Sequence, residues 1–564
     1  MTWIGGVAMK GEAGIDMLVT ILAVMSGAAY PANTVEAVHK APSVDFMIDG
    51  SYRQGFIRVS FTDREGPRED AYTDCPEGPT LLSDGYLVYR GGNGAELCTN
   101  ARGEREGTLD SLLRAPAESR DDLEQKLRAA LAHLDGDYAL AVKDADKIVA
   151  SRNLLGTKPL YFAEAAEFSA FASNKRALWA LGLGEVKPLR AGTLAILDRR
   201  GVRVRKAFPV REPAIEIRGM AQAVDSYKQV LCSAIEKRLA AARHASKVGV
   251  LLSGGVDSCL LAKLVCDIAS GLGIQTIAYT AGLPDSPDMG YASDFAREFR
   301  IEHRMQPLNI DSVESYIPKV VEAAEDSDSV QVETGIGLYA ALEMASRDGI
   351  SVLFSGQGPD ELWGGYGWYH RVLAKDGRQA LCRRMRDDLN RADIETLDRE
   401  NKIAESHGAE LLFPYLDVGV VDLAMRVAPE LKVLSEEDRL GKHPHRELAL
   451  RMGIPAKYAY REKVAIQHGT GIHAILEEIA IRNGFNPEVV KRSGYKSRDI
   501  TRERLGSSSR YGYRYSDKAV WQVPEHVQFF LHALAYKKGL LNWSLRDRIG
   551  QFLDKARVSP GFLP

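Results

Sequence analysis

The sequence lacks the features that mark several protein classes. It has only six cysteines in 564 residues and no CxxC pair, which argues against a disulfide framework or a zinc ribbon and favours reduced thiols in a cytosol. Its 73 basic and 76 acidic residues leave a net charge of −3, so no global field recruits nucleic acid or an anionic membrane. Apolar residues make up 45% of the chain and charged residues 26%, a globular composition that excludes a disordered or fibrous protein.

A long apolar run is also missing. The one membrane-like stretch, Met17 to Ala29, is shorter than the about 20 apolar residues that a spanning helix needs. A signal peptide fits poorly, because Glu12 and Asp16 would fall in its amino-terminal region. We predict a strand at residues 3–8 followed by a buried helix over the apolar stretch, in a cytoplasmic protein.

Residues 1 to about 210 contain short apolar runs separated by turn residues. Runs of strand length lie at 56–61, 86–89, 138–142, 148–150 and 194–197. This pattern indicates a β-rich layered domain. Arg211 to Ile217, which includes Pro213, has the composition of a linker.

From about residue 218 apolar strands alternate with helices, which is typical of a parallel, doubly wound sheet. The expected strands are 248–252, 274–279 and 352–354, and the expected helices are 227–242, 258–269, 291–299 and 335–347. Ligands bind such sheets beyond the carboxyl ends of the strands. We therefore expect the site in the loops after Leu252, Tyr279 and Phe354.

The string SGGVDS at 253–258 follows the first of these strands and opens a helix. Gly254 and Gly255 lack a Cβ, so backbone N–H groups can converge on an anion at the helix N-terminus. The two serines add hydroxyl donors, and Asp257 can hold the Mg²⁺ that accompanies phosphates. The Walker pattern is absent. The alternative is an ordinary strand-to-helix turn with an N-cap.

This loop resembles the pyrophosphate-binding loop of the N-type ATP pyrophosphatases, which cleave ATP to AMP and pyrophosphate. Further strings narrow the resemblance to the asparagine synthetases, in that family's order and spacing from about residue 225 to 470. They are AGLPDSPD at 281–288, SGQGPDELWGGY at 355–366, RENK at 399–402 followed by HGAE and FPYLD, KHPHRE at 442–447 and REK at 461–463.

The resemblance implies an ATP-dependent amide ligase. AMP transfer to a carboxylate neutralises the acid and installs a leaving group, and ammonia or glutamine-derived nitrogen then forms the amide. By resemblance, Mg²⁺ is held by Asp257 and Asp328. The implied ATP and pyrophosphate residues are Leu252, Ser253, Gly254, Gly255, Asp257, Ser258, Ala281, Ser355, Gly356 and Asp360.

Two further residues receive catalytic roles from the resemblance. Glu325 lies thirty residues before Ser355, about where the family places a catalytic glutamate, and would steer ammonia and accept a proton as the amine attacks. Lys463 would lie against the phosphates and neutralise charge as pyrophosphate leaves. Without the family, residues 325–328 are a solvated acidic turn and Lys463 is a surface lysine.

The amino-terminal part resembles the glutaminase domain of the glutamine-dependent members. The strings are LDGDYA at 134–139, GTKPLYF at 156–162 and ASNKRAL at 172–178. They imply a four-layer αββα fold of the N-terminal-nucleophile type. Arg58 resembles the arginine that grips the glutamine carboxylate, Gly85 belongs to the pair that forms the oxyanion hole, and Asp110 loosely matches the aspartate that binds the glutamine amine.

The glutaminase chemistry does not carry over with these strings. The family attacks glutamine with a cysteine at position two, where this chain has Thr2, and its Asn–Gly oxyanion pair is replaced by Asp84-Gly85. An N-terminal threonine can be a nucleophile, but an alkoxide is much harder to form than a thiolate. Our preferred interpretation is a domain that keeps its structural role and has lost efficient glutamine hydrolysis.

The acceptor acid and two alternative functions stay open. The family has arginines where this chain has Glu333 and Leu412, so aspartate is only the first candidate, and a lactam synthetase of the β-lactam synthetase type acting on another acid is the alternative. A nucleotide- or RNA-binding scaffold would use the interleaved Arg510 to Tyr515. A tRNA thiolation enzyme would use cysteines such as Cys259.

The predicted domains are 1–210, 218–484 and a basic, aromatic extension over 485–564. The expected partners are ATP, a carboxylic acid and ammonia or glutamine, without a membrane or nucleic acid, and a homodimer is one option for assembly.

Overall fold

The chain folds as two compact units, Met1–Arg211 with Asp393–Gly408, and Glu212–Ala392 with Ala409–Pro564. Side chains are described only within residues 124–558. The computed structural model describes residues 2–10, 16–26, 47–49, 58–60, 62–63, 66–67, 80–91, 94–98, 123–131, 134–144, 147–166, 168–198, 200–206, 214–242, 245–497, 500 and 523–558.

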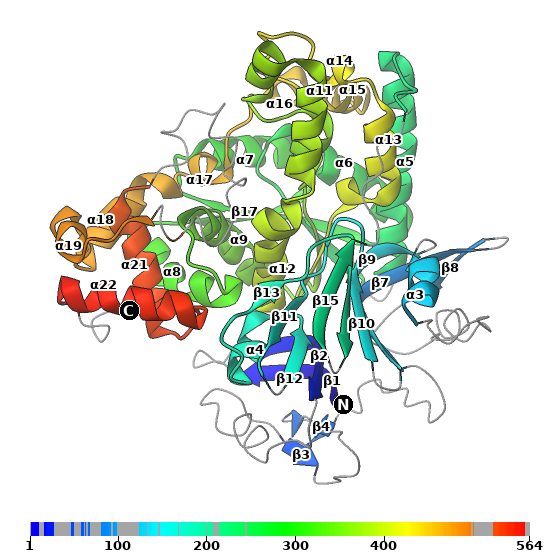
Figure 1. The fold of residues 1–564 in the computed structure, drawn as a ribbon. Helices are drawn as coiled ribbons and strands as arrows, with labels where there is room; N and C mark the ends of the chain where they lie inside the picture. The colour runs from blue at the N-terminus through cyan, green and yellow to red at the C-terminus, as the bar shows by residue number, and fades with distance from the viewer. Residues whose placement is uncertain are drawn as a thin grey trace. The chain divides into compact units, whose positions relative to one another are not determined.

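The first unit is built on two large sheets (Figure 1). One has the strand order β1 (Thr2–Lys10), β2 (Asp16–Ser26), β12 (Phe168–Ala172), β11 (Tyr161–Glu164), β13 (Lys187–Pro188). The other has the order β15 (Gly201–Lys206), β14 (Thr193–Asp198), β10 (Lys147–Arg152), β9 (Leu134–Asp144), β7 (Thr80–Gly91), β8 (Gly94–Cys98). Short antiparallel pairs join β3 (Met47–Asp49) to β4 (Arg58–Ser60) and β5 (Thr62–Asp63) to β6 (Gly66–Pro67).

The two sheets share one core and each contacts a helix. Residues two apart on β9 and β10, including Ala139, Ala141 and Ile148, pack with Phe162 of β11 and Phe171 of β12. This spacing places alternate side chains on the face between the sheets. Helix α3 (Leu123–Leu131) packs on β9 and helix α4 (Lys175–Ala180) on β11 and β12, which gives the predicted αββα layers.

The helix predicted over Met17 to Ala29 is wrong. The segment forms strand β2, which pairs antiparallel with β1 on one side and with β12 on the other. A continuous apolar run does not distinguish a buried helix from a strand with neighbours on both sides. Here the β-branched Val19, Ile21 and Val24 favour the strand, and strand pairing satisfies its backbone groups.

Residues 393–408, which lie within the predicted domain 218–484, cluster with the first unit as the π-helix η1 (Asp393–Leu397) and helix α12 (Asp398–Glu405). Asp393 is fully buried and accepts two hydrogen bonds from the Arg190 side chain, at 2.9 and 3.0 Å, and one from the Ala191 backbone N–H at 2.8 Å. Buried Arg152 lies 3.8 Å from Asp393 and donates to the carbonyls of Gly156, Lys158 and Leu189.

The second unit is built on a parallel sheet of order β18 (Glu302–Pro307), β17 (Gln275–Gly282), β16 (Lys247–Leu251), β19 (Val352–Phe354), β20 (Glu410–Leu412). Its helices are α5 (Met220–Ala241), α6 (Val256–Gly271), α7 (Pro287–Phe299), α8 (Ile310–Ala324), α9 (Ser329–Arg347), α10 (Pro359–Trp363), α11 (Tyr369–Leu389), α13 (Val418–Arg426), α14 (Pro429–Lys432), α15 (His443–Arg451), α16 (Ala456–Ala459), α17 (Ile466–Gly469), α18 (Leu476–Arg482), α19 (Pro487–Ser493), α21 (Glu525–Lys537) and α22 (Trp543–Ala556). Two 3₁₀ turns are η2 (Pro414–Leu416) and η3 (Ile472–Ile475).

The chain order of these parallel strands creates a switch point. From the central strand β16 the chain runs outward through β17 to β18, and it then returns to build β19 and β20 on the other side. The connections therefore diverge between β16 and β19. In open parallel sheets, ligands bind in the crevice at the carboxyl ends of the two strands that flank such a point.

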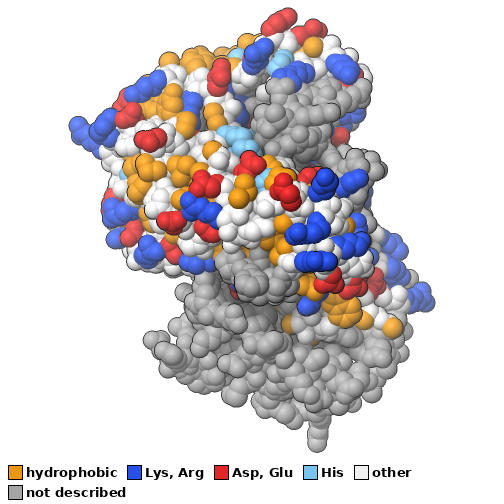
Figure 2. All heavy atoms as spheres, turned by 90° about the vertical axis from the view of Figure 1, so that its left-hand side faces the viewer, with side chains coloured by type: hydrophobic (Ala, Val, Ile, Leu, Met, Phe, Trp, Pro, Cys, Tyr) orange, Lys and Arg blue, Asp and Glu red, His pale blue; other side chains and the backbone are white. Residues whose placement is uncertain are grey.

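The described part of residues 485–558 clusters with the second unit. Helix α21 packs against α8 and α9, and α19 and α22 pack on each other. On the face in Figure 2, basic and acidic side chains are interspersed over the described surface. The stretch Arg510 to Tyr515 lies outside the described residues. No described helix is both long enough and apolar enough to cross a membrane.

We predict that Asp393→Ala lowers the free energy of unfolding by about 3–5 kcal/mol, because it removes the buried carboxylate that lies beside Arg152 and accepts hydrogen bonds from Arg190 and Ala191. Urea unfolding of the full chain measures the change. Glu124→Ala removes a partly exposed i,i+4 pair with Arg128 and should cost below about 1 kcal/mol. Equal losses for both substitutions would contradict the role of Asp393.

Candidate functional site

The loop 253–258 follows β16 and leads into α6, whose first helical residue is Val256. The Ser258 hydroxyl ties the loop together: it accepts from the Ser253 backbone N–H at 3.1 Å, lies 3.2 Å from the Ser253 hydroxyl and donates to the Gly255 carbonyl. The loop therefore forms a closed turn at the N-terminus of a helix of 16 residues, the arrangement that binds anions.

Gly254 is required by the space around this turn. Its φ is +72°, and a Cβ there would lie 2.4 Å from the Tyr291 Cβ and 2.7 Å from the Ala292 nitrogen. Both the backbone angle and the close approach of α7 therefore exclude a side chain. The loop after β19 also comes close, since a Cβ on Gly356 would lie 3.5 Å from the Ser258 nitrogen.

The buried ammonium of Lys442 joins two carboxylates. Its Nζ lies 2.6 Å from Asp257 Oδ2 and 2.7 Å from Asp360 Oδ1, and the side chain is 1% exposed. Burial by itself raises the pKa of the Asp257 carboxyl, but Lys442 and His445 together hold it well below its ordinary value. The pKa of Asp360 is also lowered, by Lys442 and Lys463 against the effect of burial. Both aspartates are therefore ionised.

Lys463 is the outer cation of this cluster. Its Nζ lies 2.8 Å from Asp360 Oδ2. Burial lowers its pKa, but the Asp360 and Asp257 carboxylates outweigh that effect and raise the pKa above its ordinary value. Two carboxylates thus face two lysines, with the Arg461 guanidinium beside them. Each of these three cationic side chains pairs with a carboxylate, and together they offer an anionic ligand such as pyrophosphate three positive groups beside the loop.

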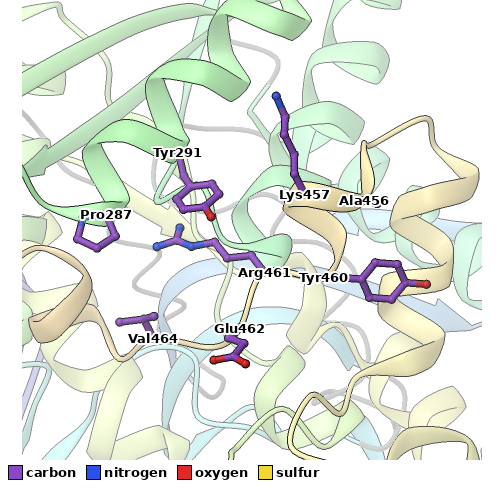
Figure 3. Close-up of a pocket in the computed structure, with 8 residues that line it drawn as sticks. All are labelled: Pro287, Tyr291, Ala456, Lys457, Tyr460, Arg461, Glu462 and Val464. Atoms are coloured by element: carbon purple, nitrogen blue, oxygen red, sulfur yellow. The ribbon is translucent and has the colours of Figure 1, made fainter.

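Arg461 fixes the loop from the other side. Its guanidinium donates to the Ser253 carbonyl at 2.8 Å and to Asp288 Oδ1 at 2.6 Å, and it lies 4.2 Å from the centre of the Tyr291 ring. Figure 3 shows Arg461 reaching toward this ring while the side chain of Glu462 points away. Burial raises the pKa of Asp288, and Arg461 offsets part of that shift.

The segment 461–464 separates two spaces. The inner one, of about 50 Å³, is lined by Ser253, Asp257, Lys442 and Lys463 among others. The outer pocket in Figure 3 has a volume of about 440 Å³ and lies against Tyr291, Tyr460 and Val464. Arg461, Glu462 and Val464 line both. The inner space therefore has room for only a few water molecules.

Arg446 positions the segment that carries these cations. This buried guanidinium donates to four carbonyl oxygens, those of Leu440, Gly441, Ala459 and Arg461. These bonds therefore hold the turn before Lys442 against the segment 459–461, which precedes Lys463. Tyr415 supports the loop similarly, since its hydroxyl donates to the Asp257 carbonyl at 2.8 Å.

Glu325 and Asp328 lie on the turn between α8 and α9. Glu325 is buried and has a left-handed φ of +50°, uncommon for a residue other than glycine. The Asp328 carboxylate caps α9 by accepting from the Val330 N–H at 3.0 Å. Gln528 of α21 brackets this turn by donating to the Ser327 carbonyl and accepting from the Ser329 N–H. The carboxy-terminal helices thus hold the predicted catalytic turn in shape.

The remaining predicted nucleotide residues lie at the strand ends. Leu252 is buried and its N–H donates to the Tyr279 carbonyl, while Ala281 is buried near the end of β17. Ser355 directly follows β19 and is buried. Leu252 and Ser355 directly follow β16 and β19, as the sequence predicted, whereas β17 extends past Tyr279 to Gly282 and Ala281 is its penultimate residue.

The structure describes only the backbone of three residues that were predicted to bind or hydrolyse glutamine. Thr2 starts β1, Arg58 starts β4 and Gly85 lies in β7 opposite Tyr138, but the side chains of these strands are outside the described residues. Asp110 lies outside them altogether. Their roles stay predictions.

Sequence reasoning missed the functions of Lys442, His445, Arg446 and Arg461. All four stand inside the strings that carried the family resemblance, but no charge pattern showed which carboxylate each would meet. For Lys442, His445 and Arg461 a partner lies more than 150 residues away, namely Asp257, Asp257 and Ser253, whereas the carbonyl partners of Arg446 lie within 15 residues.

Gly365→Ala tests the lysine bridge. A Cβ there would lie 1.9 Å from Lys442 Cε and 2.2 Å from Asp360 Oδ1, so the bridge must shift. We expect ATP to bind at least about tenfold more weakly, the scale of one hydrogen bond to a charged group. Gly367→Ala is the matched control, because nothing lies within 4 Å of its Cβ. Equal ATP dissociation constants for the two variants would contradict this role.

The chain was compared with known proteins. The asparagine synthase family matches residues 226–387 and 373–532, and the glutamine amidotransferase domain family matches 109–180. A Methanocaldococcus jannaschii protein, named as a glutamine-hydrolyzing asparagine synthetase 1, is 30% identical over 403 residues, covering 63% of this chain and 73% of that protein. The glutamine-hydrolyzing asparagine synthetase B of Escherichia coli is 26% identical, covering 62% of this chain and 64% of its own. The structure of NMN synthetase from Francisella tularensis matches at 13% identity over 57% of this chain and 95% of that chain, with a TM-score of 0.25, too low to carry an argument.

The asparagine synthase match thus spans more than half of the chain and includes the loop 253–258, Lys442, Lys463 and the strands of the switch point. The chain belongs to the asparagine synthetase family and is an ATP-dependent carbon–nitrogen ligase that carries a glutamine amidotransferase-type region before its ligase domain.

Proposed function

We propose that the enzyme adenylates a carboxylic acid, with aspartate as the first candidate, releases pyrophosphate and then forms an amide with a nitrogen nucleophile. The observation that carries this proposal is the cationic cluster of Lys442, Lys463 and Arg461 against the loop 253–258. The charge is concentrated where a β,γ-pyrophosphate would sit. Such an arrangement stabilises the leaving group and directs attack to the α-phosphorus.

The nucleotide would lie across the switch point. The N–H groups of the loop and the start of α6 would hold the phosphates, and the backbones at Leu252, Ala281, Ser355 and Gly356 would border the adenosine. Lys463, at the edge of the inner space, would follow the developing charge as pyrophosphate departs. Asp360 would keep that ammonium charged and oriented.

Mg²⁺ fits the donors present. Asp257 Oδ1 is buried and accepts no hydrogen bond from the described residues, although His445 Nε2 lies 3.2 Å from it. A carboxylate oxygen of this kind suits Mg²⁺, which usually takes one or two carboxylates and completes its shell with phosphates and water. Asp257, with Asp328 as a second ligand, would hold the ion that neutralises the phosphate charge.

Free ammonia is the proposed nitrogen source. Thr2 in place of a cysteine and Asp84 in place of an oxyanion donor both weaken glutamine hydrolysis. Glu325 would steer the ammonia. The alternative of ring closure within one substrate, as in a lactam synthetase, is supported by the departures at Glu333 and Leu412.

Lys463→Ala should lower turnover by about 10²–10³ with little change in unfolding midpoint, the scale of one preorganised donor. Pyrophosphate release measures it. Lys457→Ala is the control: that lysine also lies beside the outer pocket but pairs with Glu298 and is 56% exposed. We expect it to leave turnover within about twofold, as is usual for an exposed pair. An unchanged rate in Lys463→Ala would refute the assignment.

The proposed function is tested by ATP turnover with aspartate and ammonium, glutamine or no nitrogen source. We expect AMP and pyrophosphate, not ADP, and more amide with ammonium than with glutamine. Glutamine working as well as ammonium would show an active amino-terminal glutaminase. ATP–pyrophosphate exchange that needs no acid, or that never occurs, would contradict acid adenylation and favour a scaffold.

A further inference from the structure

A histidine and a glutamate form a pair that the roles above do not use. His473 Nδ1 of η3 lies 3.0 Å from Glu333 Oε2 of α9. Because an ionised carboxylate can only accept, Nδ1 donates the proton and Nε2 is left as the basic nitrogen. Glu333 is 1% exposed, whereas His473 is 24% exposed, so the imidazole is the member that a substrate can reach.

Burying the Glu333 carboxylate costs free energy that a purely structural contact would not require. Glu333 Oε1 is buried and has no hydrogen-bond partner among the described residues. Burial raises the pKa of the Glu333 carboxyl, with His473 and His468 opposing the shift and Asp328 adding to it. The hydrogen bond to Glu333 in turn raises the pKa of His473. The His468 ring packs edge-on, 4.6 Å away from that of His473.

The position of the pair connects it to the nucleotide site. Thr470, three residues before His473, accepts a hydrogen bond from the Leu283 N–H directly after β17. Gly337, one turn after Glu333 on α9, is so close to the end of β17 that a Cβ would lie 3.5 Å from the Ala281 carbonyl oxygen. Ile466, at the start of α17, lines the same inner space as Ser253 and Lys463. The segment from Lys463 to His473 therefore runs from the phosphate cluster to the pair.

We propose that His473, oriented by Glu333, is the general base that takes the proton from the nitrogen nucleophile in the amide-forming step. This inference rests on the proposed function. The amine nitrogen attacks the carbonyl carbon of the acyl-adenylate and forms the C–N bond. The C–O bond to AMP breaks, and AMP leaves with the electron pair. The proton of the nitrogen passes to His473 Nε2 and then to solvent.

The role differs from that of Glu325. The family resemblance gives Glu325 both the steering of ammonia and the acceptance of its proton, and the proposal moves the second task to His473. The low basicity of a carboxylate makes it a weak acceptor for an amine proton at neutral pH. An imidazole held in one tautomer by a carboxylate has both the right geometry and a matched pKa. Glu333 touches no reacting atom in this scheme and is a positioning residue.

His473→Gln and Glu333→Gln test the proposal by separating the two half-reactions. With an acid that supports ATP–pyrophosphate exchange, we expect exchange within about twofold of the unchanged protein. Amide formation with ammonium should fall by about 10²-fold for His473→Gln, the scale of general base catalysis. Amide formation should fall less for Glu333→Gln, because the His473 imidazole remains.

The pH profile gives the second readout. The amidation rate of His473→Gln, divided at each pH by that of the unchanged protein, cancels the ionisation of ammonia. This ratio should approach one at low pH, where His473 is protonated in the unchanged protein, and should fall as pH rises through its pKa. In Glu333→Gln the inflection should move to lower pH. Two other titratable side chains, His468 and Asp328, act on Glu333. For His468→Gln, the amidation rate divided by that of the unchanged protein should not fall with pH.

His526→Gln is the matched control, because it removes another histidine that faces a glutamate, Glu477, at 3.4 Å. It should leave both half-reactions within about twofold. Equal losses of exchange and amidation in His473→Gln, or a ratio independent of pH, would overturn the proposal and leave a structural ion pair. If the unchanged protein shows no acid-dependent exchange at all, the proposed function fails and this step fails with it. Failure of the His473 assignment alone would look different, because ATP–pyrophosphate exchange would persist in the unchanged protein and in every variant.

Discussion

The ligase unit depends on one buried ammonium held between two carboxylates. Lys442 joins Asp257, at the start of the helix after β16, to Asp360, on the short helix after β19. These strands flank the point where the chain reverses across the sheet, so the lysine ties together the two sides of the ligand crevice. Without it, two ionised aspartates would face each other in a low-dielectric site, and the crevice would lose the charge that attracts phosphates.

Two of the cations of the site bind backbone carbonyls, and carboxylates pair with the lysines and with Arg461. Arg446 uses its guanidinium on four carbonyl oxygens and thereby fixes both ends of the chain that presents Lys442 and Lys463. The Arg461 guanidinium likewise donates a hydrogen bond to the Ser253 carbonyl. These bonds fix the backbone on both sides of the two lysines, which carboxylates orient beside the loop 253–258. The carboxy-terminal helices have a comparable supporting function, since Gln528 closes the turn that carries Glu325 and Asp328.

The described part of the amino-terminal unit contains a packed apolar core between its two sheets. Its two sheets bury a continuous apolar layer, and it is completed by residues 393–408 from far along the chain. Asn401, part of a string that resembles the synthetases, donates to the carbonyls of Thr157 and Leu397 within this unit. A motif whose sequence position lies within the second unit thus contributes to the packing of the first.

Apolar periodicity and glycine placement are local properties, and they were enough to predict the parallel sheet and the glycine turn at 253–258. The same reasoning misjudged Met17 to Ala29, since a fully apolar run becomes a strand only when neighbouring strands pair with it. Only the tertiary structure decided that Lys442 meets Asp257, that Arg461 meets Ser253 and that His473 meets Glu333. These contacts join residues about 140 to 210 positions apart, and no local pattern encodes which opposite charges the fold will bring together.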